Sequence, residues 1–198
     1  MFVTFEGLDG SGKTTQVDRL RARLEAEGRE VVATREPGGT PLGEGIRELV
    51  LHGHEMSPWA EALLFASARA EHVEDVIRPA LERGADVLCD RYVDSSLAYQ
   101  GIARGLGLER VLEVNLDAVG GLMPDRTFVL ALDSETASGR VGESPDRIER
   151  EEPGFRARVE AAFLELAERF PERIVVLDAS LPADKLAERI HGALRSAA

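Results

Sequence analysis

The stretch Gly7-Leu8-Asp9-Gly10-Ser11-Gly12-Lys13-Thr14 decides the fold class of this chain. It matches a phosphate-binding loop at every required position, since glycine stands first and sixth and is followed by lysine and threonine. Glycines let the backbone curl until several N–H groups point at phosphate oxygens, and the positive end of the following helix strengthens the attraction. The motif therefore predicts a phosphate site at the start of a helix.

Lys13 carries more information than most lysines would, because lysine is rare in this chain. Lys13 and Lys185 are the only lysines among 24 basic residues. A compact ammonium group fits inside a tight loop where a planar guanidinium group does not. We therefore expect an ATP site rather than an ordinary glycine turn, with Lys13 on the outer phosphates and Thr14 on Mg²⁺. The residues of this segment expected to bind ATP are Gly7, Leu8, Asp9, Gly10, Ser11, Gly12, Lys13, Thr14 and Thr15.

Short apolar runs alternate with helical stretches along the chain. The loop lies between an apolar run at residues 2–6 and a helical stretch at residues 13–27, which Gly28 ends. Further strands are expected at residues 31–33, 86–90, 127–132 and 174–177, and further helices at residues 41–51, 57–82, 109–118, 154–169 and 182–194.

This alternation predicts the α/β fold class. Parallel strands need long right-handed connections and helices on both faces of their sheet. With 198 residues, the chain can build one core and is shorter than chains that usually divide. We therefore expect a single domain at residues 1–198, with a five-stranded parallel sheet between two layers of helices. With the phosphate loop after its first strand, this is the three-layer P-loop NTPase fold, whose ligands bind at the carboxyl ends of the strands.

Charge and composition exclude several classes of partner. The formal net charge of −12 repels polyanions, so we expect no nucleic-acid partner. No apolar run approaches the ~20 residues that span a bilayer, and no signal peptide is recognisable, so we expect a cytoplasmic protein without a membrane partner. Cys89 is the only cysteine, and its apolar neighbours predict a core thiol.

Three further segments concern the second substrate. Residues 34–40, Thr-Arg-Glu-Pro-Gly-Gly-Thr, place a cation and a rigid turn after the second strand, although a tight loop without function would look the same. Asp90-Arg91-Tyr92 ends the third strand, where the carboxylate can reach Mg²⁺ and the arginine can lie across transferring phosphates, with an ordinary ion pair as the alternative. In residues 94–101 the side chains that can share one helix face are Ser96, Tyr99 and Gln100.

Together these segments closely resemble thymidylate kinases of the bacterial type, over nearly the whole chain. The resemblance rests on Phe5-Glu6-Gly7, residues 34–40, Phe65-Ala66-Ser67-Ala68-Arg69, Asp90-Arg91-Tyr92 and residues 95–101. It implies a P-loop fold of the nucleoside monophosphate kinase type that uses ATP and Mg²⁺ to phosphorylate dTMP to dTDP in dTTP biosynthesis. The alternatives are another nucleoside monophosphate or deoxynucleoside kinase, or a switch NTPase, which would need a guanine-reading Asn-Lys-x-Asp motif.

The resemblance also implies roles for individual residues. Asp9 would contact the 3′-hydroxyl of the acceptor and the surroundings of the metal, and Tyr99 would leave no room for a 2′-hydroxyl. Phe65 would stack on thymine, while Arg69 and Gln100 would bind its edge. The arginines implied to hold the acceptor phosphate are Arg35, Arg47 and Arg91. The full set expected to bind dTMP is Asp9, Arg35, Pro37, Arg47, Phe65, Arg69, Arg91, Ser96, Tyr99 and Gln100, and the expected metal ligands are Thr14 and Asp90.

A segment at about residues 138–154 is rich in Gly, Pro, Glu and Arg and lacks an apolar face, which predicts a mobile lid over the site. The eukaryotic type carries an arginine in its phosphate loop where this chain has Gly10, so the resemblance implies that catalytic arginines come from the lid. Arg140 resembles the residue that lies against adenine, Arg147 resembles the arginine that closes on the phosphates, and Arg150 is a third candidate. The residues expected to act in catalysis are Lys13, Asp9, Arg91 and Arg147.

The same resemblance implies a homodimer, because this family usually forms one. Trp59, Leu63 and Leu64 fall at helical spacing and are candidates for a contact between subunits.

Overall fold

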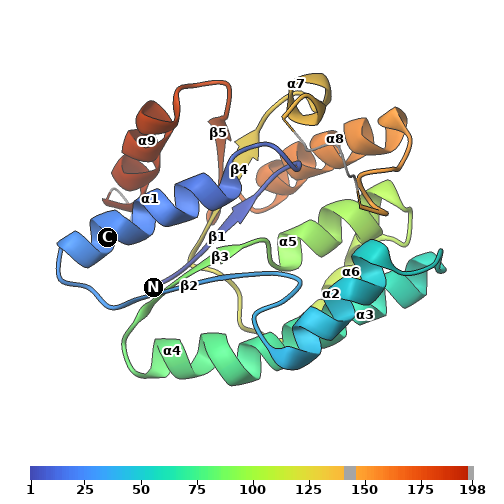
Figure 1. Ribbon diagram of the computed structural model, residues 1–198, viewed down its shortest axis with the longest axis horizontal. Coiled ribbons are helices and arrows are strands. Elements are labelled where there is room, and N and C mark those ends of the chain that lie inside the picture. Colours follow the sequence, from blue (N-terminus) through green and yellow to red (C-terminus); the bar gives the residue numbers. More distant parts are fainter. Residues whose placement is uncertain (141–145, 196–198) are drawn as a thin grey trace.

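The computed structural model describes residues 1–140 and 146–195 and places the five expected strands in one parallel sheet (Figure 1). The order across the sheet is β2-β3-β1-β4-β5, so β1 and the phosphate loop that follows it lie at the centre. The α/β fold class predicted from the sequence is thereby confirmed. The strands are β1 (Phe2–Glu6), β2 (Val31–Arg35), β3 (Asp86–Asp90), β4 (Arg126–Ala131) and β5 (Ile174–Asp178).

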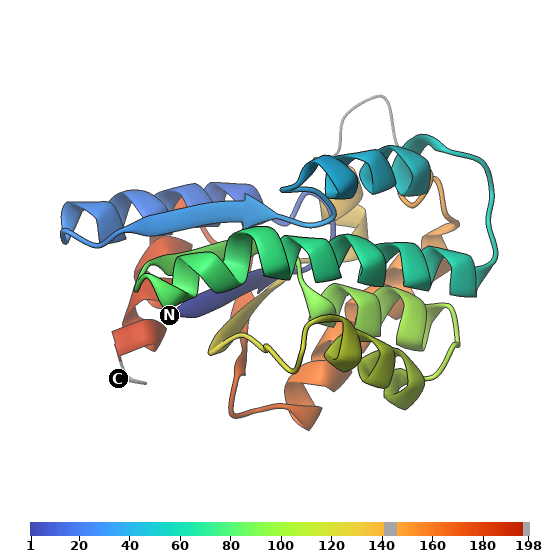
Figure 2. The same ribbon diagram turned by 90° about the horizontal axis from the view of Figure 1, so that it is seen from below.

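Helices cover both faces of this sheet. Two of them, α1 (Lys13–Ala26) and α9 (Ala183–Arg195), lie side by side on one face. The long run that begins with α3 crosses the opposite side, as seen from below in Figure 2. The other helical segments are α2 (Pro41–His52), α3 (Pro58–His72), η1 (Val73–Ile77), α4 (Arg78–Glu82), α5 (Val93–Ser96), η2 (Leu97–Ala103), α6 (Leu108–Ala118), α7 (Ser134–Ser138) and α8 (Pro153–Arg169).

The central strands are apolar because both of their faces are covered. Every residue of β1 is buried, and Phe5 on β1 lies with its ring centroid 5.7 Å from that of Phe128 on β4. Burying a side chain of this size contributes ~1.5–3 kcal/mol. Cys89 on β3 is buried as predicted, and burial raises the pKa of its thiol well above the ordinary value.

Two helices begin where capping chemistry predicts. Thr40 Oγ1 accepts the backbone N–H of Gly43 at 3.0 Å, and Ser57 Oγ accepts that of Ala60 at 3.3 Å. A proline follows each cap at the first helical position, where its missing N–H costs nothing. Both starts agree with the sequence to within a residue.

The helical run predicted at residues 57–82 is not one continuous α-helix. The π-helix η1 separates α3 from α4, and a second π-helix, η2, continues α5. The spacing of apolar residues does not reveal a π-helical turn, because the α-helical segments on either side of it each keep their own apolar pattern. The short helix α7 was also not expected.

The expected lid begins at the end of α7 and continues to the start of α8, but its residues 141–145 lie outside the described residues. Within its described part, Ile148 is buried against the core cluster. Within the described ranges we find no helix that is both long and apolar enough to cross a bilayer.

Candidate active site

The phosphate-binding loop joins β1 to α1 and needs its glycines. Gly7, Gly10 and Gly12 have φ angles of 134°, 85° and 91°, which other residues rarely adopt. A β-carbon at Gly10 would lie 2.4 Å from the carbonyl oxygen of Ala137, and one at Gly7 would lie 2.7 Å from that of Leu130. The loop is therefore packed so closely against α7 and β4 that only glycine fits at these positions.

The side chain of Lys13 is buried inside this loop. Its Nζ donates to the carbonyl oxygens of Gly7 at 3.2 Å and Leu8 at 2.9 Å, and lies 3.8 Å from Asp9 Oδ1. Burial lowers the pKa of the ammonium group, and the nearby Arg91 guanidinium adds to this effect. The loop therefore encloses an ammonium group.

Thr14 and Asp90 meet although they lie far apart in the sequence. Thr14 Oγ1 donates to Asp90 Oδ2 at 2.7 Å, because the second residue of α1 and the last residue of β3 reach the same edge of the sheet. Hydroxyl and carboxylate oxygens are the hard ligands that Mg²⁺ prefers. The pair therefore fits the metal that was expected beside the ATP phosphates.

Arg91 faces both this loop and the acceptor side. Its Nη2 donates to Asp9 Oδ1 at 2.6 Å, its Nη1 donates to Ser95 Oγ at 3.1 Å, and its guanidinium carbon lies 5.4 Å from the centre of the Tyr99 ring. Burial alone would raise the pKa of Asp9, but Arg91 and Lys13 outweigh it and hold that pKa well below the ordinary value. The backbone of Arg91 has a φ of 70°, the only positive value among the described residues other than glycine. Such a conformation costs about 1–2 kcal/mol and persists where the surroundings enforce it.

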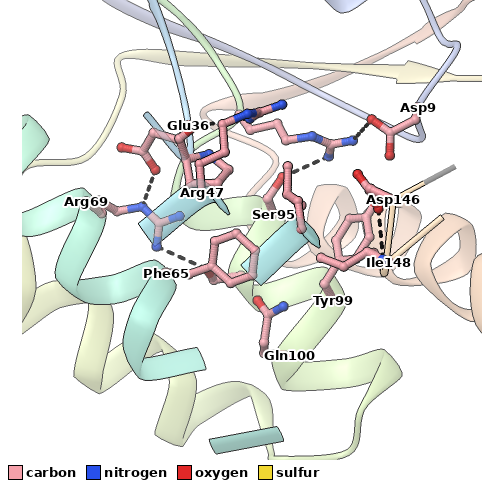
Figure 3. A pocket seen from close by; sticks show the side chains of 14 residues that line it. Asp9, Glu36, Arg47, Phe65, Arg69, Ser95, Tyr99, Gln100, Asp146 and Ile148 are labelled. Carbon is pink, nitrogen blue, oxygen red and sulfur yellow. Dashed lines mark hydrogen bonds and ion pairs between the residues drawn. The ribbon is translucent and has the colours of Figure 1, made fainter. Parts of the chain in front are cut away.

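A pocket lined in part by Asp9 and Arg91 lies next to the phosphate loop, where the acceptor was expected, and is called the acceptor pocket below (Figure 3). Figure 3 shows Phe65 and Gln100 at one end of the pocket and Arg47 and Asp9 at the other. An aromatic face and an amide at one end, with the Arg47 guanidinium and the Asp9–Arg91 ion pair at the other, suit a base and a phosphate joined by a sugar. The side chains lining the pocket are Asp9, Glu36, Pro37, Arg47, Leu51, Phe65, Arg69, Arg91, Ser95, Ser96, Tyr99, Gln100, Asp146 and Ile148.

Arg69 lines this pocket but is more enclosed than the sequence suggested, with 2 % of its area exposed. Nε donates to Glu36 Oε2 at 2.6 Å, and Nη2 donates to the carbonyl oxygen of Tyr92 at 3.0 Å. Nη1 donates to Ser96 Oγ at 3.0 Å and to Asn115 Oδ1. A guanidinium has five N–H groups, so among the described residues one N–H of Nη2 is left for a ligand. Ser96 therefore faces Arg69, and the two expected site residues form a pair.

The other two arginines expected at the acceptor phosphate differ in their surroundings. Arg47 Nη1 donates to the carbonyl oxygen of Pro37 at 3.0 Å, which keeps both residues on the wall of the acceptor pocket. Arg35 is exposed and donates from Nη2 to Glu44 Oε1 at 3.0 Å. It lines the pocket around the phosphate loop, together with Arg47 and Arg91. The peptide bond between Glu36 and Pro37 is cis.

Arg147 is buried and does not line the pocket around the phosphate loop. It was expected at the transferring phosphates, but the structure buries its side chain beneath the acceptor pocket, where Nη2 donates to Glu61 Oε2 at 2.6 Å and Nε donates to the carbonyl oxygen of Val50 at 2.9 Å. Two arginines of one segment look alike in sequence, and the buried carboxylate that attracts this one lies 86 residues away. Arg140, by contrast, is exposed and lines the phosphate-loop pocket. Arg150 is exposed as well.

Sequence reasoning missed two buried carboxylates. Glu6 accepts N–H groups from the segment after β3, and Glu61 accepts from three side chains around the acceptor pocket. Glu6 was quoted only as part of the resemblance, although an acid immediately before the phosphate loop, at the end of a buried strand, is a signal that could have given it a role. Glu61 lies in the first turn of a helix, where acids are common, so no local signal marks it.

Taken together, the fold, the phosphate loop with its Thr14–Asp90 pair and the adjoining second pocket define a P-loop nucleotide kinase. The family model that matches the chain is that of thymidylate kinase, over residues 5–190. The chain belongs to the thymidylate kinase family.

Individual relatives agree with this assignment. A protein of Bifidobacterium longum (strain DJO10A), named thymidylate kinase, is 53 % identical over 185 residues, covering 91 % of this chain and 90 % of the relative. A protein of Deinococcus radiodurans, also named thymidylate kinase, is 49 % identical over 197 residues, covering 98 % of this chain and 96 % of the relative. The crystal structure of thymidylate kinase from Ehrlichia chaffeensis superposes with a TM-score of 0.81 at 35 % identity and covers 98 % of each chain.

Proposed function

We propose that this chain transfers the terminal phosphoryl group of ATP to dTMP, giving dTDP and ADP, in dTTP biosynthesis. An oxygen of the dTMP phosphate forms a bond to the γ-phosphorus of ATP while the bond from that phosphorus to the β,γ-bridging oxygen breaks. The acceptor oxygen is ionised near neutral pH, so no strong base is needed. Positioning and neutralisation of charge carry the catalysis.

One observation carries this proposal: the same side chains line both pockets. The residues that line both the pocket around the phosphate loop and the acceptor pocket are Asp9, Glu36, Arg47 and Arg91. Two nucleotides bound in these pockets would meet at their phosphates, between the guanidinium groups of Arg47 and Arg91. This arrangement supports transfer between two nucleotides rather than hydrolysis of one.

The residues around the meeting point have distinct roles in this proposal. Lys13 binds the outer phosphates of ATP, and Arg91 lies across the oxygens on which charge grows during transfer. Asp9 holds Arg91 in place and accepts from the 3′-hydroxyl of dTMP. Thr14 and Asp90 hold Mg²⁺, which neutralises negative charge on the ATP phosphates when it is bound.

The remaining residues select the acceptor. Phe65 stacks on thymine, Gln100 and the remaining N–H of Arg69 bind its edge, and Arg35, Arg47 and Pro37 frame the phosphate. Tyr99 is buried between Phe155 and Phe163, with both ring centroids 6.2 Å from its own, so its ring cannot move aside for a 2′-hydroxyl.

The wider organisation is proposed as follows. Residues 1–198 form one kinase domain that acts in the cytoplasm, and about residues 138–154 form its lid, with Arg140 against adenine. Two chains form a homodimer through α2 and α3, because Leu42, Leu49 and Leu63 on these helices are 48 %, 55 % and 52 % exposed.

A panel of acceptors tests the function. ADP release from ATP would be measured with dTMP, dUMP, other nucleoside monophosphates and free nucleosides. We expect dTMP to give the highest kcat/KM, and a higher value for another monophosphate or a nucleoside would assign a different kinase on the same scaffold. A switch NTPase would instead show slow hydrolysis that no acceptor accelerates. Against that alternative, the sequence offers only Asn115-Leu116-Asp117 in place of an Asn-Lys-x-Asp motif, and Asn115 is buried in α6 and accepts from Arg69.

A further inference from the structure

Glu61 is a buried carboxylate to which the mechanism above gives no role. It lies in the first turn of α3 with 1 % of its area exposed. Its Oε1 accepts from Gln100 Nε2 at 2.9 Å and from Arg104 Nε at 2.7 Å. Its Oε2 accepts from Arg104 Nη2 at 3.0 Å and from Arg147 Nη2 at 2.6 Å. The end of η2, which carries Gln100 and is followed by Arg104, and the segment before α8 therefore converge on one side chain of α3.

The two arginines keep this carboxylate charged and hold it still. Burial alone would raise the pKa of Glu61, but hydrogen bonds from Arg104, Gln100 and Arg147 outweigh it and lower that pKa. Arg104 binds both oxygens at once, which prevents rotation of the carboxylate. Arg104 also pairs with Glu151 at 2.7 Å, so two carboxylates balance the charges of Arg104 and Arg147.

The charge on Glu61 dictates which way the amide of Gln100 points. An ionised carboxylate can only accept hydrogen bonds, so the Gln100 amide must turn its nitrogen toward Glu61. Its other end, the oxygen Oε1, then faces the acceptor pocket that Gln100 lines (Figure 3). Without Glu61 the amide of Gln100 would fit equally well after a half-turn, so either its oxygen or its nitrogen could face the base.

We propose that Glu61 is a positioning residue that sets the base selectivity of this site, by holding the carbonyl oxygen of Gln100 toward the base. A carbonyl oxygen can accept from the N3–H of thymine. It repels cytosine, whose ring nitrogen at the same place is an acceptor. The inference rests on the proposed function, because it names what selects the base in the proposed dTMP site.

The test compares dTMP with 5-methyl-dCMP, which keeps the methyl group and the sugar phosphate but lacks the N3–H group. The Glu61→Gln variant keeps the shape of the side chain, but its amide can donate as well as accept, so the Gln100 amide is free to turn over. We expect the ratio of kcat/KM for dTMP over 5-methyl-dCMP to fall about tenfold or more, with most of the loss on dTMP. An equal loss on both substrates, or an unchanged ratio, overturns the proposal.

The matched control is Arg104→Gln, which damages the same network but leaves the carboxylate facing Gln100. We expect it to lower the melting temperature and to keep the substrate ratio within about twofold. If it changes the ratio as much as Glu61→Gln does, the effect is general to the network and the proposal is wrong. Wild-type protein that does not phosphorylate dTMP would refute the proposed function instead, before any variant is compared.

A measurement on the wild-type chain covers the case in which Glu61→Gln does not fold. The side-chain amide of Gln100, assigned by its disappearance in Gln100→Met, should show slow hydrogen exchange for the Nε2 proton that Glu61 accepts. Rapid exchange of both Nε2 protons would mean that the amide is not held, and would overturn the proposal.

Discussion

Glu6 Oε1 accepts the backbone N–H of Tyr92 at 2.8 Å and so ties the last residue of β1 to the turn that carries Arg91. The same oxygen accepts from Ser95 N at 3.2 Å, and Oε2 lies 2.5 Å from Ser95 Oγ. The buried carboxylate of Glu6 therefore binds the backbone that follows Arg91 and helps to fix the left-handed conformation of that residue. Burial raises the pKa of Glu6 to about 7, with Asp94 adding to the effect.

This raised pKa predicts how stability depends on pH. The folded state binds a proton at Glu6 more tightly than the unfolded state, whose pKa is near 4.5, so stability falls as pH rises from about 4.5 to 7. The full effect is roughly 3 kcal/mol, at about 1.4 kcal/mol for each pKa unit. In Glu6→Gln the neutral amide keeps the acceptor for Tyr92 and cannot ionise. We expect its free energy of unfolding to exceed that of the wild type at pH 8, by an amount that shrinks toward pH 4.5.

Urea unfolding at several pH values measures this difference. Glu188→Gln removes an exposed carboxylate and serves as the control. Curves for Glu6→Gln and wild type that stay parallel from pH 4.5 to 8 would show that Glu6 titrates normally.

Lys13 and Lys185 provide a matched pair for testing the phosphate loop. Lys13 is enclosed by the loop, whereas Lys185 is exposed on α9 and pairs with Glu188 at 3.0 Å. We expect Lys13→Ala to lower kcat/KM by at least about 10²–10³-fold, because a buried charge that meets the transferring phosphates is lost. Lys185→Ala should leave kcat/KM unchanged. The prediction fails if Lys13→Ala, with circular dichroism like that of the wild type, retains near-normal kinetics.

Phe65 is the aromatic face of the acceptor pocket. Stacking of a base on an aromatic ring contributes ~1–3 kcal/mol, so we expect Phe65→Ala to raise the KM for dTMP by about 5- to 150-fold with a smaller effect on the KM for ATP. Leu164→Ala on α8 removes an exposed apolar side chain elsewhere and is the control. Equal rises in both KM values would argue for general damage rather than for lost stacking.

The Thr14–Asp90 pair predicts a metal requirement. We expect a chelator to abolish ADP release and added Mg²⁺ to restore it. Asp90→Asn removes a charged oxygen ligand, so it should raise the Mg²⁺ concentration for half-maximal activity by about tenfold. A titration of activity with Mg²⁺ at saturating ATP decides the matter, and an unchanged midpoint for Asp90→Asn would remove that residue from the metal site.

Exposed leucines test the proposed homodimer. Leu63→Glu places a charge on the exposed face of α3, so it should shift the protein from dimer to monomer in sedimentation velocity. Leu164→Glu makes the same change at a leucine that is 44 % exposed on α8, and should leave the dimer intact. A wild-type chain that sediments as a monomer would refute the dimer itself.

Much of the nucleotide site could be predicted because its chemistry is local. Residues 7–14 carry both the backbone shape and the ammonium group of the phosphate loop, and the apolar runs around it are long enough to give the five strands. Thr14 and Asp90 were each expected at Mg²⁺, and the structure brings their side chains together. Both residues follow or end a central strand, and parallel strands bring their carboxyl ends to one edge of the sheet.

Tertiary structure decided what each arginine does. No local pattern shows which partners Arg69, Arg91 and Arg147 will find. In the structure Arg69 is enclosed by four protein partners, Arg91 lines two pockets and Arg147 is paired with Glu61. The partners of Arg147 and Arg91 lie 86 and 82 residues away. The local sequence pattern determines which backbone conformations are possible. The position of a long charged side chain depends instead on which opposite charges the packing buries within its reach, because an unpaired buried charge is too costly. That choice exists only once the whole chain is folded.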